Sequence, residues 1–100
     1  MQQILEVAKP QIQQLIKKYK VEKLYAFGSV CTDNFSNESD VDLLVSFGDM
    51  PLLDFADNYF DFQNDLETIL KRKIDLVVEK SITNPYFAKT IEKTKTPLYE

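Results

Sequence analysis

The chain has 100 residues, 44% of them hydrophobic and 28% charged, which is typical of a single globular domain spanning residues 1–100. Its formal net charge of −4 argues against direct nucleic-acid binding, which needs a basic face, and suits a basic protein partner. With one cysteine, no leader sequence and no apolar run near 18 residues, we expect a cytoplasmic protein that has no internal disulfide and does not enter a membrane. Because the chain has no histidine, any mechanism that needs an imidazole must borrow one from elsewhere, and zinc sites of the Cys/His kind are excluded.

The first predicted element is helical and lies before residue 19. Apolar residues recur at helical spacing after Pro10, namely Ile12, Leu15, Ile16 and Tyr19. Pro10 is favoured in the first turn of a helix, where its missing N–H leaves no hydrogen bond unmade. A continuous helix over residues 2–18 with a kink at the proline is the alternative.

Two strands are predicted next, with a polar segment between them. Val21–Phe27 reads as a strand that ends at Gly28. Residues 30–39 are polar and indicate a loop with room for one helical turn. Val41–Phe47 is apolar on both faces, so we expect a central strand of the sheet.

The second half of the chain predicts a long helix, a strand and a last helix. After a turn at residues 48–51, apolar residues from Leu52 to Leu70 follow an amphipathic helical pattern. Residues 73–78 read as a buried strand, and Pro85 is expected to open the last helix. The order α-β-β-α-β-α predicts an α+β fold in which helices pack on a small mixed β-sheet.

Three aspartates lie at the start of the second predicted strand and within the third. Asp40 and Asp42 are two residues apart, so on a strand both side chains point to the same face. Asp75 lies inside the third strand. Buried carboxylates are costly and repel one another, unless a divalent cation lies among them. Mg²⁺ prefers such oxygen ligands, and two ions roughly 3.5–4 Å apart can activate an attacking oxygen and stabilise a leaving pyrophosphate.

Gly28 and Ser29 are the candidate phosphate-binding residues. They end the first strand and precede Asp40 by ten intervening residues. Glycine allows a tight turn and a close approach of the main chain to a phosphate. The serine adds a hydroxyl and a backbone N–H, which bind phosphate best where a helical turn begins.

Together these residues resemble the DNA polymerase β-like nucleotidyltransferase superfamily. The Gly28-Ser29 pair, ten residues and Asp40-x-Asp42 match its signature, and Asp75 matches its third carboxylate. The short chain and the strand sequences around the motif are similar to the minimal branch, the MntA-type antitoxins. The resemblance covers nearly the whole chain and implies the nucleotidyltransferase fold, which is like the palm of polymerase β.

The resemblance also implies an activity, a partner and residue roles. Members of this branch look like ATP-dependent adenylyltransferases that transfer AMP to a tyrosine hydroxyl of a cognate HEPN-type ribonuclease toxin. Asp40 and Asp42 would bind both Mg²⁺ ions. Asp75 would bind the catalytic ion and help to deprotonate the acceptor, and Gly28 and Ser29 would bind the triphosphate of ATP. One departure from the family is that Val30, Cys31 and Thr32 stand where members often carry arginines.

Alternatives remain for the residues and for the function. Gly28-Ser29 could be a simple strand-ending turn and Asp40 a cap of a strand or loop. A catalytically weak or inactive antitoxin that neutralises its partner by binding is the second hypothesis, and the missing arginines favour it. A third is nucleotidyl transfer to a small molecule or an RNA end, which normally needs a further substrate-binding domain.

Overall fold

The protein is described here from a computed structural model, which covers residues 3–33, 35–36 and 38–100. The elements in chain order are α1 (Gln3–Val7), α2 (Lys9–Lys18), β1 (Val21–Phe27), the 3₁₀ turn η1 (Gly28–Cys31), β2 (Val41–Phe47), α3 (Leu52–Leu70), β3 (Ile74–Val78), η2 (Glu79–Ser81), α4 (Pro85–Thr94) and β4 (Thr96–Tyr99). One four-stranded sheet has the order β3-β2-β1-β4. Strand β1 runs antiparallel to β2 and β4, and β2 runs parallel to β3, so the predicted mixed sheet is confirmed.

The N-terminal helical region consists of two helices separated at Ala8. Pro10 lies in the first turn of α2, as the first of the two interpretations predicted. Helix α2 buries Ile12, Leu15 and Ile16. The preceding α1 is a separate short helix, so residues 3–18 do not form one continuous helix, and residue 2 lies outside the described residues.

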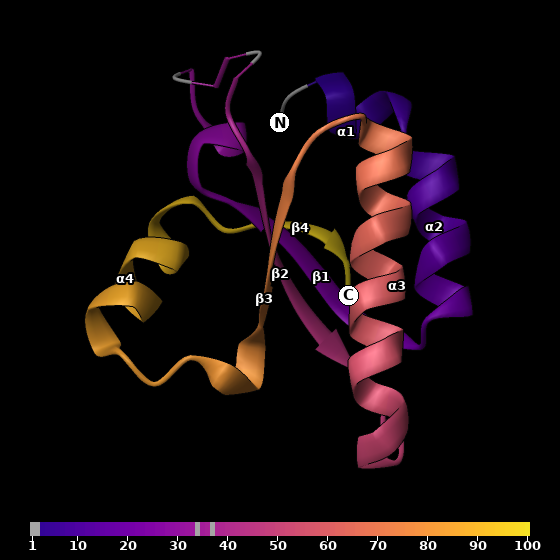
Figure 1. The fold of residues 1–100 in the computed structure, drawn as a ribbon. Coiled ribbons are helices and arrows are strands. Elements are labelled where there is room, and N and C mark those ends of the chain that lie inside the picture. Colours follow the sequence, from indigo (N-terminus) through magenta and orange to yellow (C-terminus); the bar gives the residue numbers. More distant parts are fainter. Residues whose placement is uncertain (1–2, 34, 37) are drawn as a thin grey trace.

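The two faces of the sheet have different covers. Figure 1 shows α1, α2 and α3 on one face and α4 on the other. Alternate residues of β2 belong to the larger core beneath α2 and α3, namely Val41, Leu43, Val45 and Phe47. A smaller core beneath α4 consists of Tyr25, Phe27, Leu44 and Ile91. Because side chains alternate along a strand, the residues between those of the larger core face α4.

Strand β3 is an edge strand, which corrects the expectation of a fully buried strand over residues 73–78. It begins at Ile74, and α3 covers its outer edge with polar side chains. Gln63 Nε2 donates to the carbonyl of Ile74 (2.9 Å), and the N–H of Ile74 donates to Glu67 (3.0 Å). The hydroxyl of Tyr59 donates to the carbonyl of Leu76. These bonds satisfy backbone groups that an open edge would leave available for pairing with another chain.

The opposite edge strand, β4, was not predicted from the sequence. It contains Pro97, which interrupts a strand pattern and is tolerated at a sheet edge, where one side of the strand has no ladder.

Within the described residues, no helix has the length and apolar character needed to cross a bilayer.

Candidate active site

The structure brings Asp42 and Asp75 together. Strands β2 and β3 are parallel, and the two aspartates are direct partners in their register. Each lies between residues of the larger core, Val41 and Leu43 for Asp42, and Ile74 and Leu76 for Asp75. Both carboxylates therefore point to the α4 face of the sheet. Asp42 is half-buried, whereas Asp75 is exposed because its strand lies at the edge.

Asp40 lies near this pair but is placed differently from the sequence expectation. Strand β2 begins at Val41, so Asp40 precedes it, and its side chain is exposed. Strand alternation therefore does not fix the direction of the Asp40 side chain. Its negative charge still acts on Asp42, which places the two carboxylates in one electrostatic environment.

Burial and nearby negative charges both act on the carboxyl group of Asp42. Burial, followed by the charges of Asp75 and Asp40 and a hydrogen bond to Asp75, raises the pKa of Asp42 to about 6. Two carboxylates side by side repel each other, and a bound cation would offset this repulsion.

The donor set fits Mg²⁺ only with help from the substrate. Among the residues that the structure describes, no three acidic or cysteine side chains are already arranged as a metal-binding group. Mg²⁺ is usually held by one or two carboxylates together with substrate phosphates and water, so a complete protein cage is not required. The Asp42–Asp75 pair could supply two such ligands, and the charge of Asp40 acts on the same pair through Asp42.

Gly28 joins the end of β1 to η1 directly beside Asp42. Its φ of +75° is in the left-handed region that favours glycine. A Cβ atom at this position would lie 2.5 Å from Oδ2 of Asp42. The glycine thus permits the turn and also leaves room for the carboxylate, which a simple strand-ending turn does not require.

The three residues after Ser29, where the sequence resemblance led us to expect arginines, have structural roles. Val30 is fully buried in the larger core, and Cys31 packs against that core. The hydroxyl of Thr32 donates to the carbonyl of Ser29 (2.9 Å) and so holds the end of η1. The turn is therefore stabilised by packing and a side-chain hydrogen bond, without positive charge at these three positions.

Sequence reasoning missed Thr94 as a residue of this site. The N–H of Gly28 donates to Oγ1 of Thr94 at 2.8 Å, which connects the candidate phosphate-binding turn to the end of α4. The two residues are 66 positions apart, and nothing in the local sequence of either indicates the contact.

Comparison with known proteins identifies the family of the chain. The polymerase β nucleotidyltransferase family matches residues 10–100, and the chain belongs to this family. A Methanocaldococcus jannaschii protein named provisionally as a protein adenylyltransferase is 37% identical over 91 residues, which are 91% of this chain and 90% of the relative. The protein adenylyltransferase MntA of Thermococcus cleftensis is 31% identical over 78 residues, covering 78% of this chain and 75% of MntA.

Solved structures share the fold. A protein described as a minimal nucleotidyltransferase superimposes with a TM-score of 0.75 at 24% identity, covering 93% of this chain and 91% of that one. An MNT antitoxin in complex with a tri-AMPylated HEPN toxin from Shewanella oneidensis gives a TM-score of 0.64 at 18% identity, covering 94% of this chain and 71% of the matched chain. The fold expected from the sequence, a minimal nucleotidyltransferase, is confirmed.

Proposed function

We propose that this chain is an ATP-dependent protein adenylyltransferase that uses two Mg²⁺ ions and acts as the antitoxin of a HEPN-type ribonuclease toxin. It would transfer AMP to a tyrosine hydroxyl of that toxin. The observation that carries the proposal is the direct pairing of Asp42 with Asp75 beside the left-handed turn at Gly28. Relatives named as protein adenylyltransferases support the proposed reaction. A solved complex of an antitoxin with a similar fold and a HEPN toxin supports the proposed partner.

The residues of the site would have different roles in the reaction. The tyrosine oxygen bonds to the α-phosphorus of ATP, the bond from that phosphorus to the bridging oxygen breaks, and pyrophosphate leaves. Ser29 would hold the triphosphate through its backbone N–H and its hydroxyl, and Gly28, whose own N–H is bonded to Thr94, would let the main chain approach the phosphates closely. Asp40 and Asp42 would hold both ions, which stabilise the negative charge of the phosphates and the attacking oxygen.

Asp75 is the proposed acceptor of the tyrosine proton and a ligand of the catalytic ion. Its position on the edge strand leaves its carboxylate exposed, so the hydroxyl of a large protein substrate can approach it. Asp42, half-buried next to it, is less accessible and better suited to ion binding. The two carboxylates therefore differ in role because one strand is central and the other lies at the edge.

We also propose a cytoplasmic location and no direct contact with nucleic acid or membrane. A net charge of −4 favours a basic protein surface over a phosphate backbone as the docking partner.

Intact-mass spectrometry of the HEPN partner tests the activity. The product of the neighbouring gene, as the candidate partner, is incubated with this protein, ATP and Mg²⁺, and we expect a mass gain of one or more AMP units. Asp42→Asn should abolish the gain. Asp57→Asn is the matched control, because it removes the same charge from an exposed position of α3 and should leave the gain unchanged. Transfer at the normal rate by Asp42→Asn would falsify the assignment of Asp42.

A binding-only antitoxin is the second candidate, favoured by the absence of arginines after Gly28-Ser29. In that case the wild-type chain forms a stable complex with the toxin without changing its mass. Asp42→Asn would then still neutralise the toxin in cells, whereas an enzyme-only mechanism predicts that growth is lost with this variant.

A further inference from the structure

Arg72 is the only arginine in the chain, and it lies in the short connection between α3 and β3. Its Nη1 donates to two backbone carbonyls of the segment before β2, that of Ser36 at 2.7 Å and that of Ser39 at 3.0 Å. Its guanidinium carbon also lies 4.4 Å from the centre of the Phe35 ring. One side chain thus contacts three described residues of the segment that leads to Asp40.

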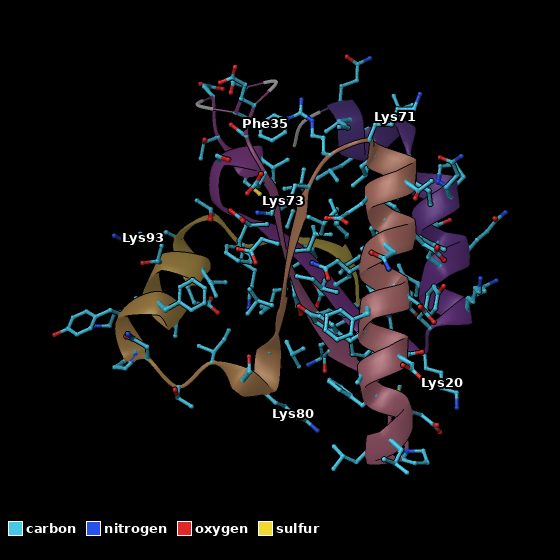
Figure 2. The ribbon with its side chains drawn as sticks, in the orientation of Figure 1. Lys20, Phe35, Lys71, Lys73, Lys80 and Lys93 are labelled. Carbon is cyan, nitrogen blue, oxygen red and sulfur yellow. The ribbon has the colours of Figure 1, made fainter. Side chains whose placement is uncertain are left out.

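These contacts fasten a segment that has its own turn. The N–H of Ser39 donates to the carbonyl of Ser36 (3.1 Å), and the N–H of Ser36 donates to Oγ of Ser39 (3.0 Å). Phe35 packs against the larger core, which anchors the start of the turn. Figure 2 shows Phe35 at the same end of the molecule as Lys71 and Lys73, the neighbours of Arg72.

The backbone on both sides of Asp40 is held by two consecutive residues. Arg72 binds the carbonyl of Ser39, which immediately precedes Asp40. The carbonyl of Lys73 accepts the N–H of Val41 (3.0 Å), which immediately follows it. Residues 72–73 lead directly into β3, which carries Asp75. The connection that places Asp75 therefore also places Asp40.

We propose that Arg72 is a positioning residue that holds Asp40 within reach of the Asp42–Asp75 pair. This inference rests on the proposed function of these aspartates in binding Mg²⁺. Asp40 lies outside β2, so the sheet does not hold it. Its repulsion by Asp42 would tend to move it away, and the contacts of Arg72 oppose that movement.

The shape of the arginine side chain allows a combination of contacts at this position that a lysine could not make. A guanidinium is planar, so it can bind two carbonyls in its plane while its face lies over an aromatic ring. An ammonium group on a flexible stem is a point charge and does not reproduce this combination. Arg72→Lys therefore keeps the charge and removes the geometry.

The test measures Mg²⁺ dependence separately from folding. Arg72→Lys and Arg72→Gln are compared with the wild type by thermal unfolding during a titration with Mg²⁺ and a non-hydrolysable ATP analogue, and by AMP transfer at each Mg²⁺ concentration. Loss of a residue that orients a metal ligand typically weakens metal binding roughly 10–100-fold, so we expect a half-saturating Mg²⁺ concentration about tenfold higher or more. Saturating Mg²⁺ should return the transfer rate of Arg72→Lys close to that of the wild type.

Lys71→Gln is the matched control, since it removes a positive charge from the adjacent exposed residue and should leave the Mg²⁺ midpoint unchanged. Hydrogen exchange supplies a readout without substrate, because the amides of Ser36 and Ser39 should exchange faster in Arg72→Lys. If both Arg72 variants unfold, Phe35→Leu replaces them, because it removes the stacking surface and keeps an apolar side chain. It should shift the midpoint in the same direction by a smaller factor.

Two results separate this inference from the proposed function. Folded Arg72 variants with an unchanged Mg²⁺ midpoint would overturn the role of Arg72, even if their melting temperature falls. A wild-type chain that binds Mg²⁺ and the ATP analogue but transfers no AMP would contradict the proposed function, while the midpoints from thermal unfolding would still decide the role of Arg72.

Discussion

The two faces of the sheet use the same strands for different purposes. One face is covered by α1, α2 and α3 and is apolar along the whole of β2 (Figure 1). The other face is covered by α4 alone and changes along β2 from the buried Leu44 to the half-buried Asp42. A small domain can thus place charged residues in its sheet because alternation directs them away from the face that supplies most of the apolar burial.

Truncation of buried side chains should reveal the largest difference in stability between the two faces of the sheet. Phe62 is fully buried in the larger core and packs against the rings of Tyr19 and Phe47, with centroids at 5.6 and 5.8 Å. Phe62→Ala should cost about 3–5 kcal/mol of unfolding free energy. Ile91→Ala on the α4 face should cost about 2 kcal/mol, because fewer buried residues surround it and the site can collapse more easily.

Urea unfolding of both variants measures this difference. Equal losses would show that the smaller core contributes as much to stability as the larger one, and the division of tasks between the faces would be wrong.

Substitution of Thr94 tests whether α4 supports nucleotide binding by the turn at Gly28. Thr94→Val has nearly the same shape but removes the hydroxyl that accepts the N–H of Gly28. We expect the KM for ATP to rise about tenfold, which corresponds to about 1.4 kcal/mol, because the turn loses its connection to α4. Thr94→Ser should restore the wild-type value. A lower KM would instead mean that the N–H of Gly28 leaves Thr94 to bind a phosphate.

The ionised carboxylate of Asp42 on the α4 face should lower the free energy of unfolding above neutral pH. Since its pKa is raised from 3.8 to about 6, the folded state binds more protons than the unfolded state between these values. The stabilising contribution is therefore present below about pH 4 and is lost as the pH rises through about 6.

Asp42→Asn should consequently be more stable than the wild type at about pH 7.5, by roughly 1 kcal/mol after allowance for solvent screening of a half-buried group. The difference should disappear below about pH 4 and shrink when Mg²⁺ is added, since the ion offsets the charge only in the wild type. Urea unfolding in a chelating buffer across this pH range measures it. A variant less stable than the wild type at pH 7.5 would contradict the electrostatic assignment.

The sequence by itself determined the elements whose signals are local. The bounds of β1, β2 and α3 follow from apolar periodicity between glycine and proline turns, and the structure confirms them. The Gly28-Ser29 and Asp40-x-Asp42 spacing indicated the family, which the family match confirms. Their roles at the site remain predictions.

Only the tertiary structure decided which distant groups meet. The pairing of Asp42 with Asp75 depends on the parallel register of β2 and β3, which no local pattern specifies. The contact of Thr94 with Gly28 and the contacts of Arg72 with the segment before Asp40 join residues more than 30 positions apart. Edge strand β4 forms although Pro97 weakens its strand signal, because pairing with β1 on one side is sufficient. The exposure of Asp75 likewise follows from the place of β3 at the edge, since burial depends on neighbouring strands that the local sequence does not reveal.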